Sequence, residues 1–385
     1  MKVLMVTDNY CLEEVDGVYY HRCIDEHIAA YRSLGEIRLL MPVLHDISYN
    51  RVVDLSSVGV RAIDKENTIS KRFINRKNNK AIFDEEIKNA DIVIGFVPSS
   101  VCDLALKYAK KYHKIFISVV ISSAWDILWH HSLAGKILAP ISHVSTSRTI
   151  RNSDYVIYVT DQYLQRKYPT NGVSVGISDV VVPETSHTIM DKRKERIEAC
   201  LNTKKVRIAT IGAVDVKYKA QDDVIKAMSI LASEGYDIDY TLIGGGSTAR
   251  LRKCAEENGV SLDKIRFMGA VPHEQIYGLL DEFDLYIQPS RTEGMPRSVV
   301  EAMSRGLIVI CSNVGGMPEI VDNKCVYRSG NITELTESIR FMLASKQRMI
   351  DTSIRNFNKA KCFGRDFLDR KRSEFLTQVK KDFIK

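Results

Sequence analysis

Short runs of apolar residues alternate with longer amphipathic stretches along most of the chain. The apolar runs predict buried strands at 3–6, 37–41, 92–97, 115–121, 155–159, 206–211, 240–243, 265–268, 285–287 and 308–311. In 222–234 and 333–344 the apolar residues recur at helical spacing instead, which predicts amphipathic helices. Because alternating apolar strands and helices form parallel sheets covered by helices, the pattern predicts an α/β fold.

The strand–helix pattern begins twice, near 2–6 and again near 206–211, which indicates two domains of similar design. Between these starts, residues 184–205 are mostly polar and charged, and we interpret them as the connection between domains plus one helix. The expected domains are residues 1–183, residues 184–365 and a final basic amphipathic helix at 366–385. A ligand site is expected in the cleft between two such domains, at the carboxyl ends of the strands.

The composition is that of a soluble globular protein. Of 385 residues, 45% are hydrophobic and 27% are charged, and the formal net charge is +7. This charge suits an anionic ligand or an anionic membrane surface, and it is too small to indicate nucleic-acid binding. No apolar run is long enough for a transmembrane helix and the first residues do not form a signal peptide, so we expect a cytoplasmic protein. The eight scattered cysteines are expected to be reduced thiols.

The segment 284–306 is the most informative for function. A strand ends before a loop that carries Glu293, and Pro296 marks the first turn of a helix that ends at Gly306. This order places Glu293 and the helix N-terminus together at the carboxyl edge of the strand. Because free backbone N–H groups at a helix N-terminus bind anions, the segment predicts a phosphate site. Glu301 lies further into the helix, where a carboxylate suits a ligand hydroxyl.

At these motifs the chain resembles the retaining family 4 glycosyltransferases, which have the GT-B fold. The matching motifs occur in the family's order and are Ile211-Gly212, Lys219, Ile243-Gly244-Gly245-Gly246, Glu293, Glu301 and Val314-Gly315-Gly316-Met317-Pro318-Glu319. The resemblance covers about 206–343 and implies two Rossmann-like, parallel-sheet domains facing each other across a cleft. Residues 155–160 and 164–169 resemble members of the family that build bacterial cell-surface polysaccharides.

The resemblance implies a catalytic and donor-binding set in the second domain. Glu293 would contact the transferred sugar near the reacting carbon, Lys219 would pair with the diphosphate, and Glu301 would bind the ribose hydroxyls. Further residues expected at the donor are Gly212, Lys217, Gly244, Gly245, Val271, Gly294, Met295 and Arg297. No cofactor or metal site is implied. The Asp237-Ile238-Asp239 motif precedes its strand, at the edge of the sheet away from ligands.

The sequence departs from the family pattern in the expected phosphate clamp. An Arg usually follows the glycine that ends the first strand of this domain, and none follows Gly212. Lys217, Arg291 or Arg297 would have to supply the second cation. The missing Arg leaves open which residues bind the diphosphate, but a nucleotide site is still expected.

A second departure concerns the first domain. Many relatives place a His after the strand predicted at 115–121, whereas this chain has Trp125 and Asp126 in that loop. An aromatic ring can stack on the apolar face of a sugar and a carboxylate can accept a hydroxyl proton, so Asp126 joins the catalytic candidates. Gly17, in a loop that faces the diphosphate and acceptor in relatives, is expected on the acceptor side together with Trp125.

The predicted function is transfer of a hexose from a UDP- or GDP-linked sugar to an acceptor hydroxyl, with retention of configuration. The resemblance places this reaction in capsular polysaccharide, exopolysaccharide or lipopolysaccharide assembly, with a glycan or lipid-linked glycan as acceptor. The densest basic cluster is expected to contact anionic lipid headgroups at the inner face of the cell membrane. Its residues are Lys71, Arg72, Arg76, Lys77 and Lys80.

Other classes of function were weighed against this one. A non-catalytic nucleotide-sugar- or glycan-binding protein with the same fold would account for the missing Arg and His. An NAD-dependent oxidoreductase would need a G-x-G-x-x-G motif after the first strand, and residues 5–10 contain no glycine. A phosphorelay receiver would need a second acid beside Asp8 and a phospho-acceptor Asp after a later strand, and neither is evident.

Overall fold

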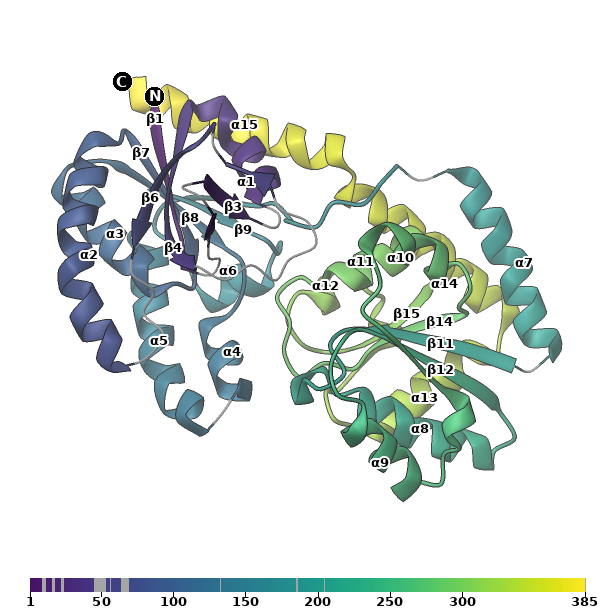
Figure 1. Cartoon of the computed structure of the whole chain (residues 1–385). Coiled ribbons are helices and arrows are strands. Elements are labelled where there is room, and N and C mark those ends of the chain that lie inside the picture. Colours follow the sequence, from purple (N-terminus) through teal and green to yellow (C-terminus); the bar gives the residue numbers. More distant parts are fainter. Residues whose placement is uncertain are drawn as a thin grey trace. The chain divides into compact units, whose positions relative to one another are not determined.

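The structure, a computed structural model, describes residues 1–8, 12–15, 18–21, 24–44, 53–55, 57–63, 69–131, 133–184, 186–203 and 205–384. The chain divides into two compact units (Figure 1). The first unit combines Met1–Trp129, Leu133–Asp179 and Asp369–Lys385, and the second is formed chiefly by Val180–Leu368. The boundaries expected from the sequence, after 183 and after 365, lie within a few residues of this division.

A parallel sheet with strand order β10–β9–β8–β7–β1–β4–β6 forms the core of the first unit. Its strands are β1 (Lys2–Val6), β4 (Glu36–Leu44), β6 (Gly59–Ile63), β7 (Ile92–Val97), β8 (Ile115–Val120), β9 (Tyr155–Tyr158) and β10 (Val173–Gly176). The central strand β7 is buried along its whole length, as expected for a strand with an apolar residue or glycine at every position. Beyond β4, three short strands extend the sheet, namely β2 (Leu12–Val15), β3 (Val18–His21) and β5 (Val53–Asp54).

Helices connect the strands of this unit. They are α1 (Ile24–Tyr31), α2 (Ile69–Asn89), α3 (Ser100–Lys111), α4 (Ala124–His131), α5 (Leu133–Arg151) and α6 (Tyr163–Lys167). The final helix, α15 (Arg365–Ile384), returns to the first unit, where Phe375 packs edge-on against Tyr155 at 5.9 Å between ring centroids. The Tyr155 hydroxyl also donates a hydrogen bond of 2.6 Å to Asp382. The C-terminal segment therefore contributes to the packing of the first unit.

The second unit contains a parallel sheet with strand order β13–β12–β11–β14–β15–β16. Its strands are β11 (Lys205–Ile211), β12 (Asp237–Ile243), β13 (Ile265–Gly269), β14 (Leu285–Gln288), β15 (Ile308–Ser312) and β16 (Val326–Tyr327). Its helices are α7 (His187–Thr203), α8 (Gln221–Ser233), α9 (Ala249–Glu257), α10 (His273–Leu280), α11 (Arg297–Ser304), α12 (Met317–Ile320), α13 (Ile332–Leu343) and α14 (Lys346–Ala360). The buried residues of β11, β14 and β15 form the centre of its hydrophobic core.

Every strand predicted from an apolar run is present, and the predicted α/β class is confirmed for both units. The polar connection between the units contains α7, as expected. One detail of the sequence interpretation is wrong: Asp237 and Asp239 belong to the first residues of β12 instead of preceding it. They form ion pairs with Lys264 and Lys205 at the amino edge of the sheet. Among the described residues, no group of three or more His, Cys, Asp or Glu side chains is arranged to hold a metal ion.

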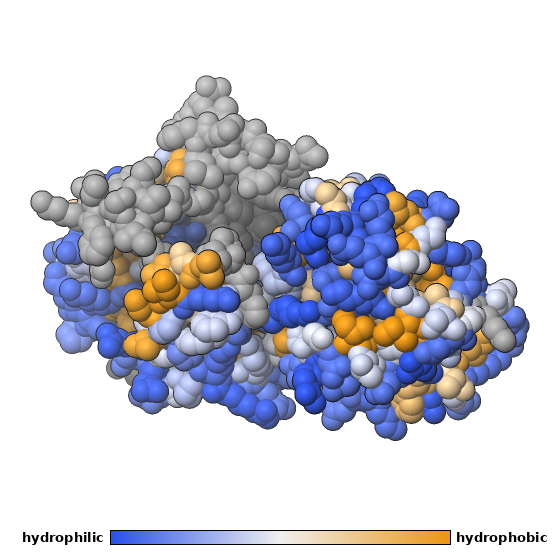
Figure 2. All heavy atoms as spheres, turned by 90° about the horizontal axis from the view of Figure 1, so that it is seen from below, coloured by the Kyte–Doolittle hydropathy of each residue, from blue (hydrophilic) through white to orange (hydrophobic). Residues whose placement is uncertain are grey.

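The described surface seen in Figure 2 is mostly hydrophilic, with separate hydrophobic patches. Six cysteines lie in the described residues and all are free thiols, of which Cys362 is exposed and the others are buried. Burial raises the pKa of Cys200 and of Cys325 to about 12, so these thiols stay protonated and unreactive near neutral pH. No helix within the described ranges is long and apolar enough to cross a membrane.

Candidate functional site

The predicted site residues of the second unit gather at the carboxyl edge of its sheet. Gly212 follows β11, Gly244 follows β12, and Glu293 lies in the loop between β14 and α11. The three strands are neighbours in the order β12–β11–β14, and all their pairings are parallel. Because parallel strands end at the same edge, the three loops are adjacent, which is the usual place for a ligand in such a sheet.

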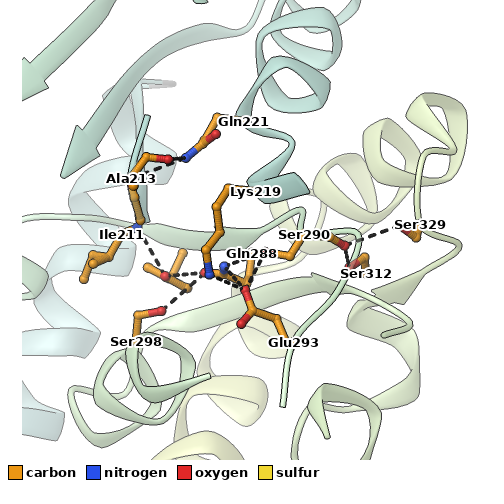
Figure 3. A network of polar contacts seen from close by, with 12 residues as sticks. Ile211, Ala213, Lys219, Gln221, Gln288, Ser290, Glu293, Ser298, Ser312 and Ser329 are labelled. Atoms are coloured by element: carbon orange, nitrogen blue, oxygen red, sulfur yellow. Dashed lines mark hydrogen bonds and ion pairs between the residues drawn. The ribbon is translucent and has the colours of Figure 1, made fainter. Parts of the chain in front are cut away.

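Glu293 accepts three hydrogen bonds at a single carboxylate oxygen (Figure 3). Its Oε1 lies 2.7 Å from Lys219 Nζ, 2.6 Å from Ser290 Oγ and 3.0 Å from Gln288 Nε2. The Glu293 side chain is only 11% exposed, and a charge-assisted hydrogen bond sheltered from water is stronger than one at the surface. None of these bonds uses Oε2, so the second oxygen of the carboxylate is left for a ligand.

A network of buried polar side chains holds the Glu293 carboxylate in place. The Tyr286 hydroxyl donates a hydrogen bond of 2.6 Å to Gln288 Oε1, and the Gln288 amide donates to Ser290 Oγ at 2.9 Å. Ser298, in the first turn of α11, donates to the same Gln288 oxygen at 3.4 Å. Tyr286, Gln288 and Ser290 are fully buried. Tyr286 and Gln288 were not among the predicted site residues. A Gln at the end of an apolar strand is nevertheless a signal of such a network, because a buried amide needs hydrogen-bond partners.

Glycines bring the strand-end loops into close contact. A Cβ at Gly212 would lie 3.4 Å from Cδ of Lys219, so the aliphatic part of that side chain crosses the backbone of Gly212. Gly244 has a φ of +157°, and a Cβ there would lie 2.2 Å from the carbonyl oxygen of Gly212. The loop after β12 therefore needs glycine so that it can approach the loop after β11. Contact of Gly244 and Gly245 with a donor stays a prediction.

The loop after β15 supports the Glu293 loop from the other side. Gly315 has a φ of +60°, and a Cβ on it would lie 2.3 Å from the carbonyl oxygen of Glu293. The N–H of Gly316 donates a hydrogen bond of 2.7 Å to the carbonyl oxygen of Gly294. The sequence analysis used Gly315 and Gly316 only as a family motif, whereas the structure assigns them to the backbone packing beneath Glu293.

We expect Gly315→Ala to reduce turnover about tenfold or more, because the added methyl group displaces the backbone that carries Glu293, the residue predicted to contact the reacting sugar, and small displacements of such a group are costly. The matched control is Gly235→Ala. Gly235 also has a positive φ, of +88°, but its Cβ would meet nothing within 4 Å. Urea unfolding and kcat/KM of both variants would check the expectation. Equal kinetics in the two variants would remove the supporting role of Gly315.

Glu301 lies in α11 and is bonded to a histidine that the sequence analysis did not connect with it. Glu301 is 3% exposed, and its Oε1 lies 2.7 Å from Nε2 of His273, the first residue of α10. The pairing could not be expected from the sequence, because His273 and Glu301 lie 28 positions apart, on two different helices. The His273 ring meets Tyr277 edge-on, and burial together with the nearby Glu301 charge raises the pKa of Tyr277 to about 12.

The three candidates for a second cation are not equivalent. Arg291 donates two hydrogen bonds to Asp223, of 2.5 and 2.9 Å, and Asp223 is 2% exposed. This buried ion pair occupies the Arg291 guanidinium, so we expect Lys217 or Arg297 to supply the second cation instead. Lys217 and Arg297 are exposed, and neither forms an ion pair with a described acidic residue. Arg297 is the first residue of α11, beside Ser298 and the network around Glu293.

Asp126, the catalytic candidate of the first unit, is already paired. Lys167 donates a hydrogen bond of 2.6 Å to its Oδ2, and the Tyr163 hydroxyl donates to the same oxygen. Burial acts to raise the pKa of Asp126, but the hydrogen bonds and the charge of Lys167 outweigh it and hold this pKa below its ordinary value. A carboxylate with a low pKa is a weak base, so the pairing argues for a role in fastening α4 to α6 and against proton acceptance.

The remaining predictions for the first unit have different outcomes. Trp125 is partly buried and stacks on Trp129, with ring centroids 5.2 Å apart and an interplanar angle of 15°. Gly17 lies outside the described residues. Lys80 is exposed on α2. The backbone of the other basic residues also belongs to α2, but their side chains lie outside the description; they are Lys71, Arg72, Arg76 and Lys77.

Comparisons with known proteins show what this chain is similar to. Residues 191–357 match the family model described as glycosyl transferases group 1. Protein CapJ of Staphylococcus aureus is 27% identical over 99% of this chain and 96% of its own length. The amylovoran biosynthesis glycosyltransferase AmsK of Erwinia amylovora is 34% identical over 31% of this chain and 30% of its own. The structure of HepE from Anabaena in complex with UDP-glucose aligns with a TM-score of 0.68 at 16% identity, over 98% of this chain and all of HepE. The predicted GT-B fold is confirmed.

Proposed function

We propose that this chain, whose residues 191–357 match the glycosyl transferases group 1 model and whose structure has the GT-B fold, is a glycosyltransferase. It transfers a hexose from a nucleoside diphosphate sugar, UDP- or GDP-linked, to an acceptor hydroxyl, and the anomeric configuration is retained. The second unit binds the donor and the first unit binds the acceptor. The product belongs to a bacterial cell-surface polysaccharide, a proposal supported by the match of 31% of the chain to an amylovoran biosynthesis glycosyltransferase.

The pairing of Glu293 with Lys219 at the edge of the second sheet carries this proposal. The leaving nucleoside diphosphate gains negative charge as the sugar departs, and the Lys219 ammonium and the start of α11 are placed to stabilise it. The sugar carbon gains positive charge at the same time, and the Glu293 carboxylate lies beside the same loop to stabilise it. Groups of opposite sign 2.7 Å apart thus match the two charges that the reaction separates.

The donor's nucleoside occupies the region of Glu301 in this proposal. Glu301 Oε1 is already bonded to His273, which fixes the carboxylate in one orientation and leaves Oε2 for the two ribose hydroxyls. Lys217 and Arg297 are exposed cations near the strand-end loops and replace the Arg that the family usually has after Gly212. The acceptor hydroxyl attacks from the face that the phosphate leaves, and a phosphate oxygen takes its proton, so Asp126 is not required as a base.

The experiment that tests this function is a thermal-shift and donor-hydrolysis screen of the purified protein. UDP-, GDP-, ADP- and CMP-linked sugars are compared, each with and without EDTA. We expect stabilisation by one diphosphate-linked sugar, accompanied by slow release of its nucleotide that EDTA does not change. A folded protein that responds to no donor would contradict the enzyme proposal and favour a non-catalytic binding protein. Loss of the response in EDTA would contradict the metal-independent donor site.

We expect Glu301→Ala to weaken donor binding about tenfold, since a hydrogen bond to a charged group contributes about 1.5–3 kcal/mol. The chemical step should change much less, because the ribose hydroxyls do not react. Calorimetric titration with the donor nucleotide, beside kcat and KM, checks this split. Glu256→Ala, which removes an exposed carboxylate from α9, is the control. A fall in kcat at unchanged affinity would place Glu301 at the chemistry instead.

The acceptor in this proposal is a glycan or a lipid-linked glycan, and the enzyme works on the cytoplasmic side of the cell membrane. The basic residues of α2 would meet anionic headgroups there. Neutralising Lys71, Arg72, Arg76 and Lys77 should reduce binding to anionic vesicles at low salt. Unchanged binding would remove α2 from the membrane contact.

A further inference from the structure

Arg291 connects the loop that carries Glu293 to the segment that carries Lys219. It lies two residues before Glu293, in the loop between β14 and α11. Its guanidinium donates two hydrogen bonds, of 2.5 and 2.9 Å, to the two carboxylate oxygens of Asp223 in α8. Its backbone N–H donates a hydrogen bond of 2.7 Å to the carbonyl oxygen of Tyr218, the residue before Lys219. Arg291 therefore holds the Lys219 segment on both sides.

The backbone beside Arg291 is itself anchored to neighbouring parts of the sheet. The carbonyl oxygen of Ser290 accepts hydrogen bonds from Ser312 Oγ at 2.6 Å and from Ser329 Oγ at 3.3 Å (Figure 3). Gly330 follows β16 with a φ of +85°, and a Cβ there would lie 3.5 Å from the central carbon of the Arg291 guanidinium. The loop is therefore a fixed support from which Arg291 can hold the Lys219 segment.

The residue after Lys219 adopts a backbone conformation that needs such support. Ala220 is buried and has a φ of +54° and a ψ of +32°, in the left-handed region. A residue with a Cβ is disfavoured there, so the turn is strained. The N–H of Ala220 bonds to the carbonyl of Lys217, and the N–H of Asp223 bonds to the carbonyl of Ala220. This turn leads the chain from Lys219 into α8, and its relaxation would change the direction of the Lys219 side chain.

We propose that Arg291 and Asp223 are positioning residues, which hold the strained turn at Ala220 and thereby keep Lys219 against Glu293. A paired guanidinium and carboxylate fix both distance and direction, which a single hydrogen bond does not. Stability alone is a weaker explanation, because apolar residues of the same volume often stabilise a protein as well as a buried ion pair does. Their role in turnover rests on the function proposed above, whereas their effect on Lys219 exists without a donor.

The first test is a double variant, Asp223→Asn with Arg291→Gln, which we call the amide variant. It removes both charges together, so no buried charge is left unpaired and the fold should persist. We expect kcat/KM to fall on the order of tenfold or more, because the ammonium group of Lys219 loses its alignment. The matched control is Asp222→Asn, at the neighbouring residue of α8, whose carboxylate pairs with Arg250 of α9 at 2.8 Å. The kinetics of this control should be unchanged.

Ala220→Gly distinguishes positioning from a general loss of stability. Glycine adopts the left-handed conformation without strain, so adding Ala220→Gly to the amide variant should recover part of the lost turnover. Ala232→Gly, at an exposed position of α8, is the control and should recover none. In a Lys219→Ala background the amide variant should cause little further loss, because the group that it positions is already absent.

A second measurement needs no donor. Acetic anhydride modifies accessible, unpaired lysine amines, and mass spectrometry then gives the extent of modification at each lysine. Lys219 is 21% exposed and paired with Glu293, so we expect it to react slowly in the unmodified protein. In the amide variant it should react several-fold faster. Lys226, which is 41% exposed, is the internal reference and should react equally in both proteins.

Unchanged turnover and unchanged acetylation of Lys219 in the folded amide variant would overturn the positioning role. Equal recovery of turnover by Ala220→Gly and Ala232→Gly would also overturn it. If urea unfolding shows that the amide variant does not fold, Arg291→Lys takes its place, since it keeps the charge but not the two parallel bonds, and it must change both readouts in the same direction. Faster acetylation in a protein that responds to no donor would support the positioning role while contradicting the proposed function.

Discussion

Glu293→Ala should lower turnover by at least about 10²-fold while the protein still binds its donor nucleotide, because the carboxylate acts on charge that develops only in the transition state. Three donors, from Lys219, Ser290 and Gln288, hold one oxygen of Glu293 in place. The pre-ordered carboxylate needs no rearrangement as the sugar carbon becomes positive. The measurement is kcat and KM with the donor identified in the screen, beside nucleotide affinity by calorimetry.

Glu282→Ala is the matched control for this variant, since Glu282 is an exposed carboxylate in the same unit. Its kinetics should equal those of the unmodified protein. Glu293→Gln should retain most of the fold stability and still lose turnover, because the amide keeps the shape but not the charge. If Glu293→Gln were fully active, the charge of this residue would not be part of the reaction.

Lys219→Ala should reduce turnover about 10²-fold and also weaken binding of the nucleoside diphosphate, since the ammonium interacts with phosphate before and during bond cleavage. Its aliphatic part crosses Gly212, which fixes the direction of the ammonium group. Lys219→Arg should recover part of the affinity but little of the rate, because the planar guanidinium cannot reproduce the contact with Glu293 in the same space. Steady-state kinetics with donor and acceptor, beside calorimetry with the nucleotide alone, separate these two effects.

The control for Lys219 is Lys226→Ala, which removes a partly exposed lysine of α8 whose ion pair within the described residues is with Asp222 of its own helix. A double-mutant cycle of Lys219→Ala and Glu293→Ala then measures their coupling. We expect the double variant to be only slightly worse than either single variant, because each loss disturbs the other partner. Fully additive losses would indicate that the two residues act independently.

Ten of the described strands were predictable from sequence because they contain apolar runs. The short strands β2, β3, β5, β6, β10 and β16 were not predicted; β2, for example, reads Leu-Glu-Glu-Val and has no apolar run to mark it. Helix α11 was predicted at both ends, and Gly306, with a φ of +63°, ends it as expected. Each of these correct predictions rested on a local signal, either an apolar run or a proline or glycine that marks the end of a helix.

The site was predictable where a residue matched a motif and not where it depended on a distant partner. Glu293 and Lys219 were found from the sequence, but their direct contact joins residues 74 positions apart. Two other contacts also join residues far apart in the sequence, and sequence spacing cannot reveal them. They are the bond between His273 and Glu301 and the ion pair of Arg291 with Asp223. Asp126 is the opposite case, a residue that sequence position alone suggested as a base. Its hydrogen bonds from Lys167 and Tyr163, which the sequence does not reveal, argue against that role.

The contact between Lys219 and Glu293 also has a consequence for the protein before a donor arrives. Each group cancels much of the other's field, so the Lys219–Glu293 pair adds little net charge of its own, and the exposed Lys217 and Arg297 supply the positive charge near these loops. In the proposed reaction, an incoming diphosphate would compete with Glu293 for the Lys219 ammonium, while Ser290 and Gln288 continue to hold the carboxylate. In this proposal, binding of the donor and release of the Glu293 charge from Lys219 therefore occur in the same step.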